Sequence, residues 1–201
     1  MLEYSEEQLD MMKEISNIAL GNSATSLSNL LNARINMSIP NVHIESISDF
    51  IEEIDDVEVI GKILILKGDI EGSVLLLFDI NTAKKIVKDI ASGQLLFQDE
   101  LDDIRISFIE EVCNIVGSTY IRNVADCLNL RIEIESSSLL YDSLTAILSY
   151  TLMEEEQFYD EILNINTDFK YELDTEMMNV YFYFVPRKGN LNKIFKTESQ
   201  F

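Results

Sequence analysis

The sequence predicts an α+β, sandwich-like fold in which a duplicated helix-strand-strand-strand-helix unit forms one continuous, mostly antiparallel sheet with long helices packed on it. Three observations predict it. A polar pattern in the first helical stretch recurs in a second one, short strand-like segments follow each stretch, and no Pro-, Ser- or Gly-rich linker separates the halves. We therefore expect one domain over residues 1–201, built from two repeats of about 1–97 and 98–201.

The first repeat begins with a long predicted helix. Ser5 is followed by Gln8, the spacing of a capping box, and apolar residues at helical spacing continue past Gly21 to Leu31. Pro40 then forces an extended chain. Strand-like segments follow at 42–47, 59–66 and 72–80, the last two joined by the turn sequence KGDIEG, and the helical sequence AKKIVKDIAS closes near Gly93.

The second repeat has the same order with one addition. We expect a helix over about 100–128, strands at 131–136, 161–171 and 178–185, and a short helix from Leu191. A further apolar helix is expected at 142–153, where the first repeat has the acidic sequence DFIEEIDDVE and no expected helix. This unmatched helix is either a core element or a docking or dimer surface.

One polar constellation occurs in both long helices, with every member displaced by 97 positions (107 − 10, 111 − 14 and 114 − 17): Asp10, Glu14 and Asn17 recur as Ser107, Glu111 and Asn114. At about 100° per residue, offsets of zero, four and seven fall within about 60° of arc, so each set shares one helix face. Asn is a mediocre helix former, so its repeated mid-helix placement needs an explanation. Either the amide caps a neighbouring element or bonds across the two-fold, or one functional site is built twice.

Composition limits the classes of partner. Fifteen Lys and Arg against thirty-six Asp and Glu give a net charge of −21, which disfavours nucleic acid and anionic membranes. The acidic amino terminus does not have the pattern of a signal peptide, and no apolar run approaches the ~18 residues of a membrane span. We therefore expect a cytoplasmic protein without membrane insertion and, because the duplication is internal, a monomer.

The residue inventory excludes several kinds of active site. His43 is the only histidine and has no ligand-spaced Cys or His nearby, so a zinc site and a Ser-His-Asp triad both lack parts. The segment at Gly21 lacks the Lys and the spacing of a phosphate-binding loop. Cys113 and Cys127 would lie about 20 Å apart on one helix, too far for a disulfide, and are expected to be small buried residues.

The repeated Glu and Asn suit one kind of chemistry. An amide both donates and accepts hydrogen bonds, so it can hold a water molecule in one orientation against an electrophile. A Gln performs this task in some phosphoryl-transfer enzymes. Such a pair suits hydrolysis at a partner's reactive group better than chemistry that this chain completes alone.

The spacing of these residues resembles a family motif: Asp or Ser, three residues, Glu, two residues, Asn, then twenty-two residues and Pro, as in the CheC, CheX and FliY phosphatases. Asp10, Glu14, Asn17 and Pro40 match it. The second copy matches the first three elements but has Ser137 in place of the Pro. The presence of two copies is most similar to CheC.

The resemblance implies a hydrolase that removes the aspartyl phosphate from the response regulator CheY in chemotaxis. Asn17 and Asn114 would position the attacking water, Glu14 and Glu111 would pair with the regulator's active-site lysine, and the residues supporting that contact would be Asp10 and Ser107. No cofactor is expected in this chain, because the Mg²⁺ would belong to the regulator. A second implied partner is the deamidase CheD, with the apolar helix at 144–152 as the expected docking surface.

Two other functions remain open. One is a non-catalytic adaptor that binds CheD or the regulator without turnover, and the other is a structural member of the flagellar switch. An enzyme would clear excess phosphorylated regulator at sub-stoichiometric concentration, whereas neither alternative would.

Overall fold

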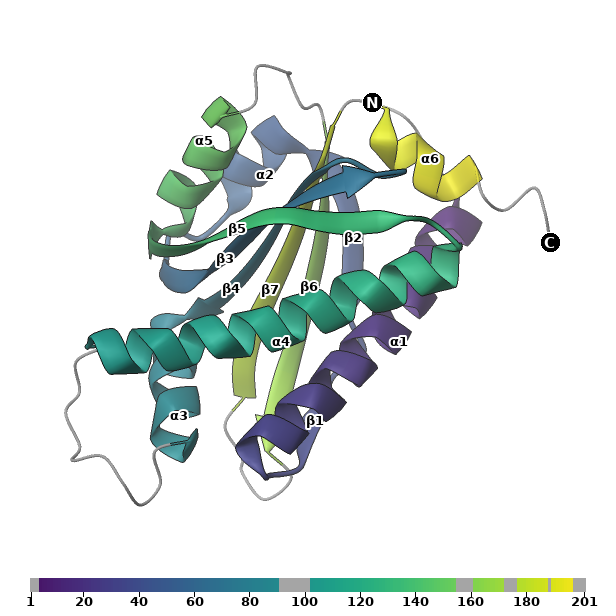
Figure 1. Ribbon diagram of the computed structural model, residues 1–201. Coiled ribbons are helices and arrows are strands. Elements are labelled where there is room, and N and C mark those ends of the chain that lie inside the picture. The colour runs from purple at the N-terminus through teal and green to yellow at the C-terminus, as the bar shows by residue number, and fades with distance from the viewer. Residues whose placement is uncertain (1–3, 91–101, 155–160, 172–176, 188, 197–201) are drawn as a thin grey trace.

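The computed structural model describes residues 4–90, 102–154, 161–171, 177–187 and 189–196. Within these ranges, seven strands form a single sheet whose pairings are antiparallel, and two long helices cross one of its faces (Figure 1). The predicted α+β class is confirmed. The expected boundary at 97/98 and the expected helix end near Gly93 lie outside the described residues, so the division into repeats of one domain stays a prediction.

The elements follow each other in two similar series. The first is α1 (Glu6–Leu31), β1 (Ile35–Met37), β2 (Asn41–Ser46), α2 (Ile47–Glu53), β3 (Glu58–Gly68), β4 (Gly72–Asp79) and α3 (Ile80–Ile90). The second is α4 (Asp103–Leu128), β5 (Ile132–Ser143), α5 (Leu144–Glu154), β6 (Glu161–Tyr171), β7 (Met177–Pro186) and α6 (Asn190–Lys196). None of the helices within the described ranges is long and apolar enough to cross a membrane.

The two long helices repeat each other from cap to cap. Both contain 26 residues, and both ends of α4 lie 97 positions after those of α1. Ser5 caps α1 with the expected capping box, and Asp102 caps α4 by accepting from the Arg105 backbone. Each helix ends at an asparagine in the left-handed conformation, Asn32 with φ 47° and Asn129 with φ 50°. Asn tolerates this conformation better than other side-chain-bearing residues, so it ends both helices at the same point.

The strands of the two series are interleaved in one sheet. The order is β1-β6-β7-β4-β3-β5, with β2 also pairing with β6. The central neighbours, β4 and β7, come from different series, and Leu76 of β4 lies opposite Phe182 of β7. Each outer strand also pairs with a strand of the other series: β5 with β3, and β2 with β6. Neither series therefore has a complete sheet of its own.

The first series contains a helix that the sequence interpretation missed. We expected no helix in the acidic stretch after β2, but α2 forms there, and α5 is therefore not an unmatched element. Ser46 caps α2 by accepting from the Asp49 backbone N at 3.1 Å, and Phe50 packs on Tyr183 with ring centroids 5.1 Å apart. The acidic residues obscured the amphipathic pattern of this short helix in the sequence. Its single buried aromatic side chain, Phe50, attaches it to the sheet.

Pro40 and Ser137 produce different strands at equivalent places. Pro40 lies between β1 and β2, whereas β5 runs continuously through Ser137 with a register shift opposite Ile65 and Leu66. Proline has no backbone N–H for a strand ladder, so it interrupts the first copy. The expected strand at 131–136 is therefore part of a longer strand.

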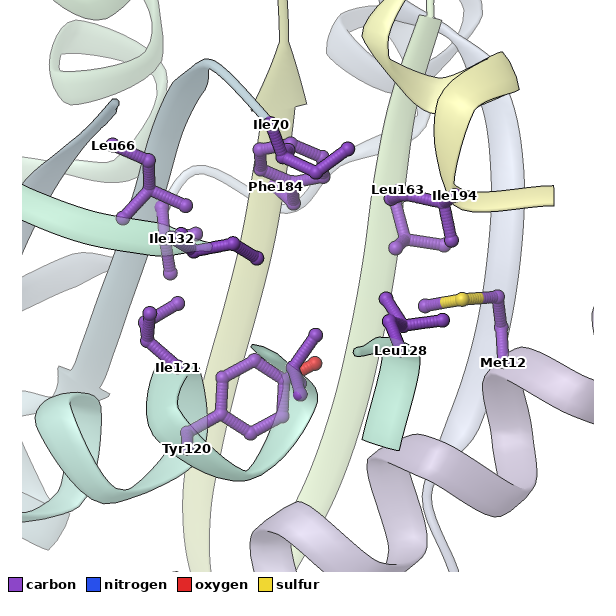
Figure 2. A pocket seen from close by; sticks show the side chains of 12 residues that line it. Met12, Leu66, Ile70, Tyr120, Ile121, Leu128, Ile132, Leu163, Phe184 and Ile194 are labelled. Carbon is purple, nitrogen blue, oxygen red and sulfur yellow. The ribbon is translucent and has the colours of Figure 1, made fainter. Parts of the chain in front are cut away.

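Two apolar layers hold the helices on the sheet. On one face α1, α3, α4 and α6 pack over side chains such as Leu76 and Phe182, and on the other α2 and α5 pack on Tyr183 and its neighbours. A void of about 30 Å³ remains in the first layer, between Met12 of α1, Leu128 of α4 and the sheet (Figure 2). Its small volume and apolar lining make it a packing gap and not a ligand site.

Two glycines provide a matched test of this packing. A Cβ at Gly61 of β3 would lie 2.0 Å from the Leu76 carbonyl oxygen, whereas one at Gly21 of α1 would meet nothing closer than Met37 Sδ at 3.9 Å. Gly61→Ala should lower the free energy of unfolding by about 1–3 kcal/mol or more, because the neighbouring backbone must move. Gly21→Ala should raise it by about 0.5–1 kcal/mol through helix propensity. Urea unfolding measures both, and equal stability of Gly61→Ala and wild type would contradict the β3–β4 packing.

Candidate functional site

The first polar stripe (Asp10, Glu14 and Asn17) lies on the solvent side of α1. All three residues are exposed, while Ile15 and Ala19 on the opposite side are buried in the core. Within the described residues, none of the three side chains makes a hydrogen bond or ion pair. Their polar atoms are therefore available to a partner.

Other asparagines perform the structural tasks considered for Asn17. Asn22 Nδ2 donates to Asn123 Oδ1 across the two long helices, and Asn32 and Asn129 end those helices. Asn17 neither caps an element nor bonds across the helix pair. The geometry thus removes the structural explanation for this residue.

The second polar stripe (Ser107, Glu111 and Asn114) is also exposed, on α4. Ser107 Oγ donates to the Asp103 carbonyl of its own helix at 2.8 Å. Ser16 Oγ lies 3.5 Å from Tyr120 Oη, and Ser23 Oγ donates to the Val116 carbonyl at 3.1 Å, so α1 and α4 run antiparallel.

Because both stripes occupy the first half of their helices, the antiparallel packing places them toward opposite ends of the helix pair. In Figure 1 the start of α1 lies near the end of α4. Asn114 of the α4 stripe lies over Lys62 of β3. The stripes are two separate sites and not two halves of one.

A buried lysine distinguishes the second site from the first. The side chain of Lys62, on β3, is only 4% exposed and lies beneath α4. Its Nζ donates to Asn114 Oδ1 at 2.7 Å, lies 3.0 Å from Glu110 Oε1, and donates to Ser137 Oγ at 3.4 Å. A charge-assisted bond thus holds the Asn114 amide oxygen toward the protein, while Asn17 has no such contact.

The position equivalent to Lys62 in the other half of the sheet is apolar. Lys62 lies opposite Leu139 on β5; 97 positions before Leu139 is Val42, and Val42 lies opposite Ile165 on β6. Ile165 is buried in the core. Sequence reasoning missed Lys62. Two signals were present: a single lysine within the apolar sequence VIGKILIL, and Ser137 in place of the motif's Pro. Ser137 Oγ accepts a hydrogen bond from that lysine.

The two cysteines differ in their surroundings. Burial raises the pKa of the Cys113 thiol to about 12, so it stays protonated at neutral pH. Cys127 is exposed, contrary to the expectation that both cysteines are buried, and both are free. No group of three or more His, Cys, Asp or Glu side chains within the described part of the chain could hold a metal ion.

The fold is similar to that of known structures. The CheC-like family matches residues 7–44, which include α1 and its stripe. The X-ray structure of Thermotoga maritima FliY has a TM-score of 0.77 with 19% identity and covers 99% of each chain. A chain of the CheX-CheY-BeF3-Mg²⁺ complex from Borrelia burgdorferi has a TM-score of 0.51 with 17% identity, covering 87% of this chain and 99% of the other.

A curated relative covers nearly the whole length. The CheY-P phosphatase CheC of Bacillus subtilis (strain 168) is 24% identical over 194 residues, 94% of this chain and 93% of the relative. Together with the family match and the shared fold, this makes the chain similar to the CheC, CheX and FliY proteins. The resemblance inferred from the sequence is confirmed.

The Lys62 contact can be tested without an activity assay. Lys62→Met keeps a long side chain but removes the donor, so the side-chain amide resonances of Asn114 should shift in a ¹⁵N-edited NMR spectrum while those of Asn17 stay unchanged. Replacing a buried ion pair by an apolar residue of similar volume is commonly neutral or stabilising, so the protein should remain folded. Lys67→Met is the control, because Lys67 lies on the same strand, is exposed and pairs with Glu135. An unmoved Asn114 resonance in Lys62→Met would refute the contact.

Proposed function

We propose that this chain is a phosphatase that accelerates hydrolysis of the aspartyl phosphate on a CheY-type response regulator. A chemotaxis phosphatase role is supported by the likeness to CheC and to a chain of a CheX-CheY complex. The observation that carries the proposal is the first polar stripe, where an exposed Asn and Glu share one helix face and neither is used by the fold. A partner's phosphate supplies the electrophile that this chain lacks.

In the proposed mechanism the α1 helix face docks against the phosphorylated site of the regulator. The Asn17 amide donates to and accepts from one water molecule, and thereby orients it for in-line attack on phosphorus. Glu14, one turn earlier on the same face, pairs with the regulator's active-site lysine, and Asp10 supports that pair. The regulator retains its own Mg²⁺, so this chain holds no cofactor.

The second stripe is proposed to act in the same way: Asn114 orients the water, Glu111 pairs with the lysine, and Ser107 supports that pair. Its use costs additional free energy. For Asn114 to enter a partner's site with its oxygen free, the bond from Lys62 must break. A hydrogen bond to a charged group contributes about 1.5–3 kcal/mol, equivalent to roughly 10- to 100-fold in rate. We therefore expect the first stripe to carry the larger share of the activity.

Three further parts of the proposal do not depend on the stripes. A cytoplasmic location is expected from the amino-terminal sequence and the short apolar runs, and a monomeric state from the internal duplication. Binding of CheD is implied by the family resemblance, with α5 as the proposed docking surface. In α5, Leu144, Ile147 and Leu148 are buried against the sheet, so core packing uses most of its apolar side chains. Tyr150 of α5 is 48% exposed.

Removing both amides tests the mechanism. Asn17→Ala with Asn114→Ala should reduce the accelerated dephosphorylation by about 10²- to 10³-fold, a typical cost of losing a positioned polar group in a transition state. The measurement is phosphate release from excess phosphorylated regulator. Asn29→Ala is the matched control, since Asn29 is exposed on α1 outside the stripe. Full activity of the double variant would exclude water positioning, and clearance limited to one equivalent in the wild type would favour the adaptor.

The single variants test the inequality of the two sites. Asn17→Ala should lower the rate more than Asn114→Ala, because Lys62 restrains only Asn114. Adding Lys62→Met to Asn17→Ala should then raise the residual rate, by up to roughly 100-fold if the full bond free energy is recovered. The same addition to Asn114→Ala should change nothing. A greater loss in Asn114→Ala than in Asn17→Ala would show that Lys62 orients the amide productively.

A further inference from the structure

A pocket of about 320 Å³ lies on the face of the sheet opposite α1 and α4. Strands β6 and β7 form its floor through Asn164 and Tyr181, and α2 and the residues that follow it form a wall that includes Glu53 and Asp55. In Figure 1, α2 and α5 lie together at this side of the sheet. The pocket is therefore separate from both polar stripes.

The wall of the pocket is held in place by hydrogen bonds to α5. The Leu144 backbone N donates to the Val57 carbonyl at 2.9 Å, and Thr145 Oγ1 donates to Asp56 Oδ1 at 2.7 Å. These bonds join the segment after α2 to the first turn of α5. The pocket is thus preformed, which lowers the ordering cost of binding.

The pocket combines negative charge with an unsatisfied buried acceptor. Glu45, Glu53 and Asp55 line it, and no basic residue is among its lining side chains in the described structure. Asn164 is 8% exposed, and its Nδ2 donates to Glu45 Oε1 at 3.0 Å, which fixes the orientation of the amide. Asn164 Oδ1 is therefore turned away from Glu45, is buried, and has no donor among the described residues; Asn166 Oδ1 is in the same condition. Such acceptors are costly unless a donor reaches them.

Two aromatic rings complete the lining. Tyr181 and Tyr183 stack with centroids 6.1 Å apart and an interplanar angle of 9°. Burial raises the pKa of Tyr183, with smaller contributions from Tyr181 and Glu45, so its hydroxyl stays neutral. Tyr183 is 2% exposed and packs on Phe50, whereas Tyr181 is partly exposed. Tyr181 therefore offers an aromatic surface in the same lining as the carboxylates, a combination that attracts a flat organic cation.

We propose that this pocket binds a guanidinium group. Guanidinium is planar, permanently charged and carries five N–H donors, so one group can pair with the carboxylates, has donors left for the amide oxygens, and has a flat face that suits the partly exposed Tyr181. An ammonium group offers three donors and no plane to stack. The side chains do not converge as a metal site requires. The group is carried either by a small molecule or by an arginine side chain of a partner protein.

Binding of N-acetyl-arginine amide, followed by two-dimensional NMR of the full chain, tests the proposal. The probe should shift the resonances of Asn164, Asn166 and the α2 wall, and saturate. N-acetyl-citrulline amide, a neutral isostere, and N-acetyl-lysine amide should bind at least five-fold more weakly. Equal binding of either control, or no saturable shift with the arginine probe, would overturn the assignment.

Two matched variants separate the pocket from the general acidity of the chain. Glu53→Gln combined with Asp55→Asn should weaken binding at least five-fold, whereas Glu52→Gln, one position away and outside the lining, should not. Equal weakening by Glu52→Gln would mean a nonspecific surface effect and refute the site. Asn17→Ala with Asn114→Ala should bind the probe as the wild type does, so the outcome is independent of the phosphatase proposal.

The source of the guanidinium is decided by a second probe, the blocked peptide acetyl-Gly-Arg-Gly-amide. Tighter binding of the peptide than of the single amino-acid amide would support an arginine of a partner protein. Tighter binding of agmatine than of the peptide would support a small molecule. Either result supports a guanidinium site.

Discussion

The antiparallel pairing of β4 with β7 is the constraint on which the rest of the structure depends. Strands β4 and β7 are the second strands of the β3–β4 and β6–β7 hairpins, and they pair at the centre of the sheet. The outer edges of β3 and β6 must therefore pair with strands from outside these two hairpins. The long helices deliver them: α1 leads to β1 and β2 beside β6, and α4 leads to β5 beside β3. Each helix must therefore cross the sheet toward the other half. Two such helices on one face lie antiparallel, and this separates the polar stripes.

The repeated helices have the same outer residues but rest on different surfaces. Beneath α4 the sheet presents Lys62 with Ser137 as an additional acceptor, whereas the equivalent of Lys62 in the other half is Ile165. Burying a lysine costs free energy unless its donors are satisfied, and here three oxygen atoms surround Nζ. One of those atoms belongs to Asn114, so the need to satisfy a buried charge restrains a residue of the outer stripe. A difference in the core can in this way make two similar helix faces unequal.

The two faces of the sheet offer different chemistry to partners. On the face that α1 and α4 cover, the two polar stripes present carboxylate and amide groups to solvent. On the other face, the short helices α2 and α5 leave a preformed acidic and aromatic pocket between them and the sheet. The net charge of −21 favours partners with a local positive charge at either place.

The sequence by itself determined the features that depend on residues close together in the chain. Helical periodicity and the capping box located α1 and α4, the turn sequence located the β3–β4 hairpin, and the spacing of Glu and Asn placed each stripe on one helix face. Local patterns failed where a tertiary contact determines the structure. The acidic stretch forms α2 because Phe50 packs on Tyr183, and Cys127 is exposed because it lies on the solvent side of α4. The helix ends at Asn32 and Asn129 could have been predicted from the sequence, because these two residues are also 97 positions apart.

Only the tertiary structure decided which stripe is restrained and that a pocket exists. Lys62 forms hydrogen bonds with Asn114, 52 positions away in the sequence, and with Ser137, 75 positions away. Asn164 forms one with Glu45, 119 positions away. No local pattern encodes these contacts, because they arise from the exchange of outer strands between the two halves of the sheet. The residues of both stripes can be found by reading the chain, but what lies beneath each one depends on which strand the fold brings there.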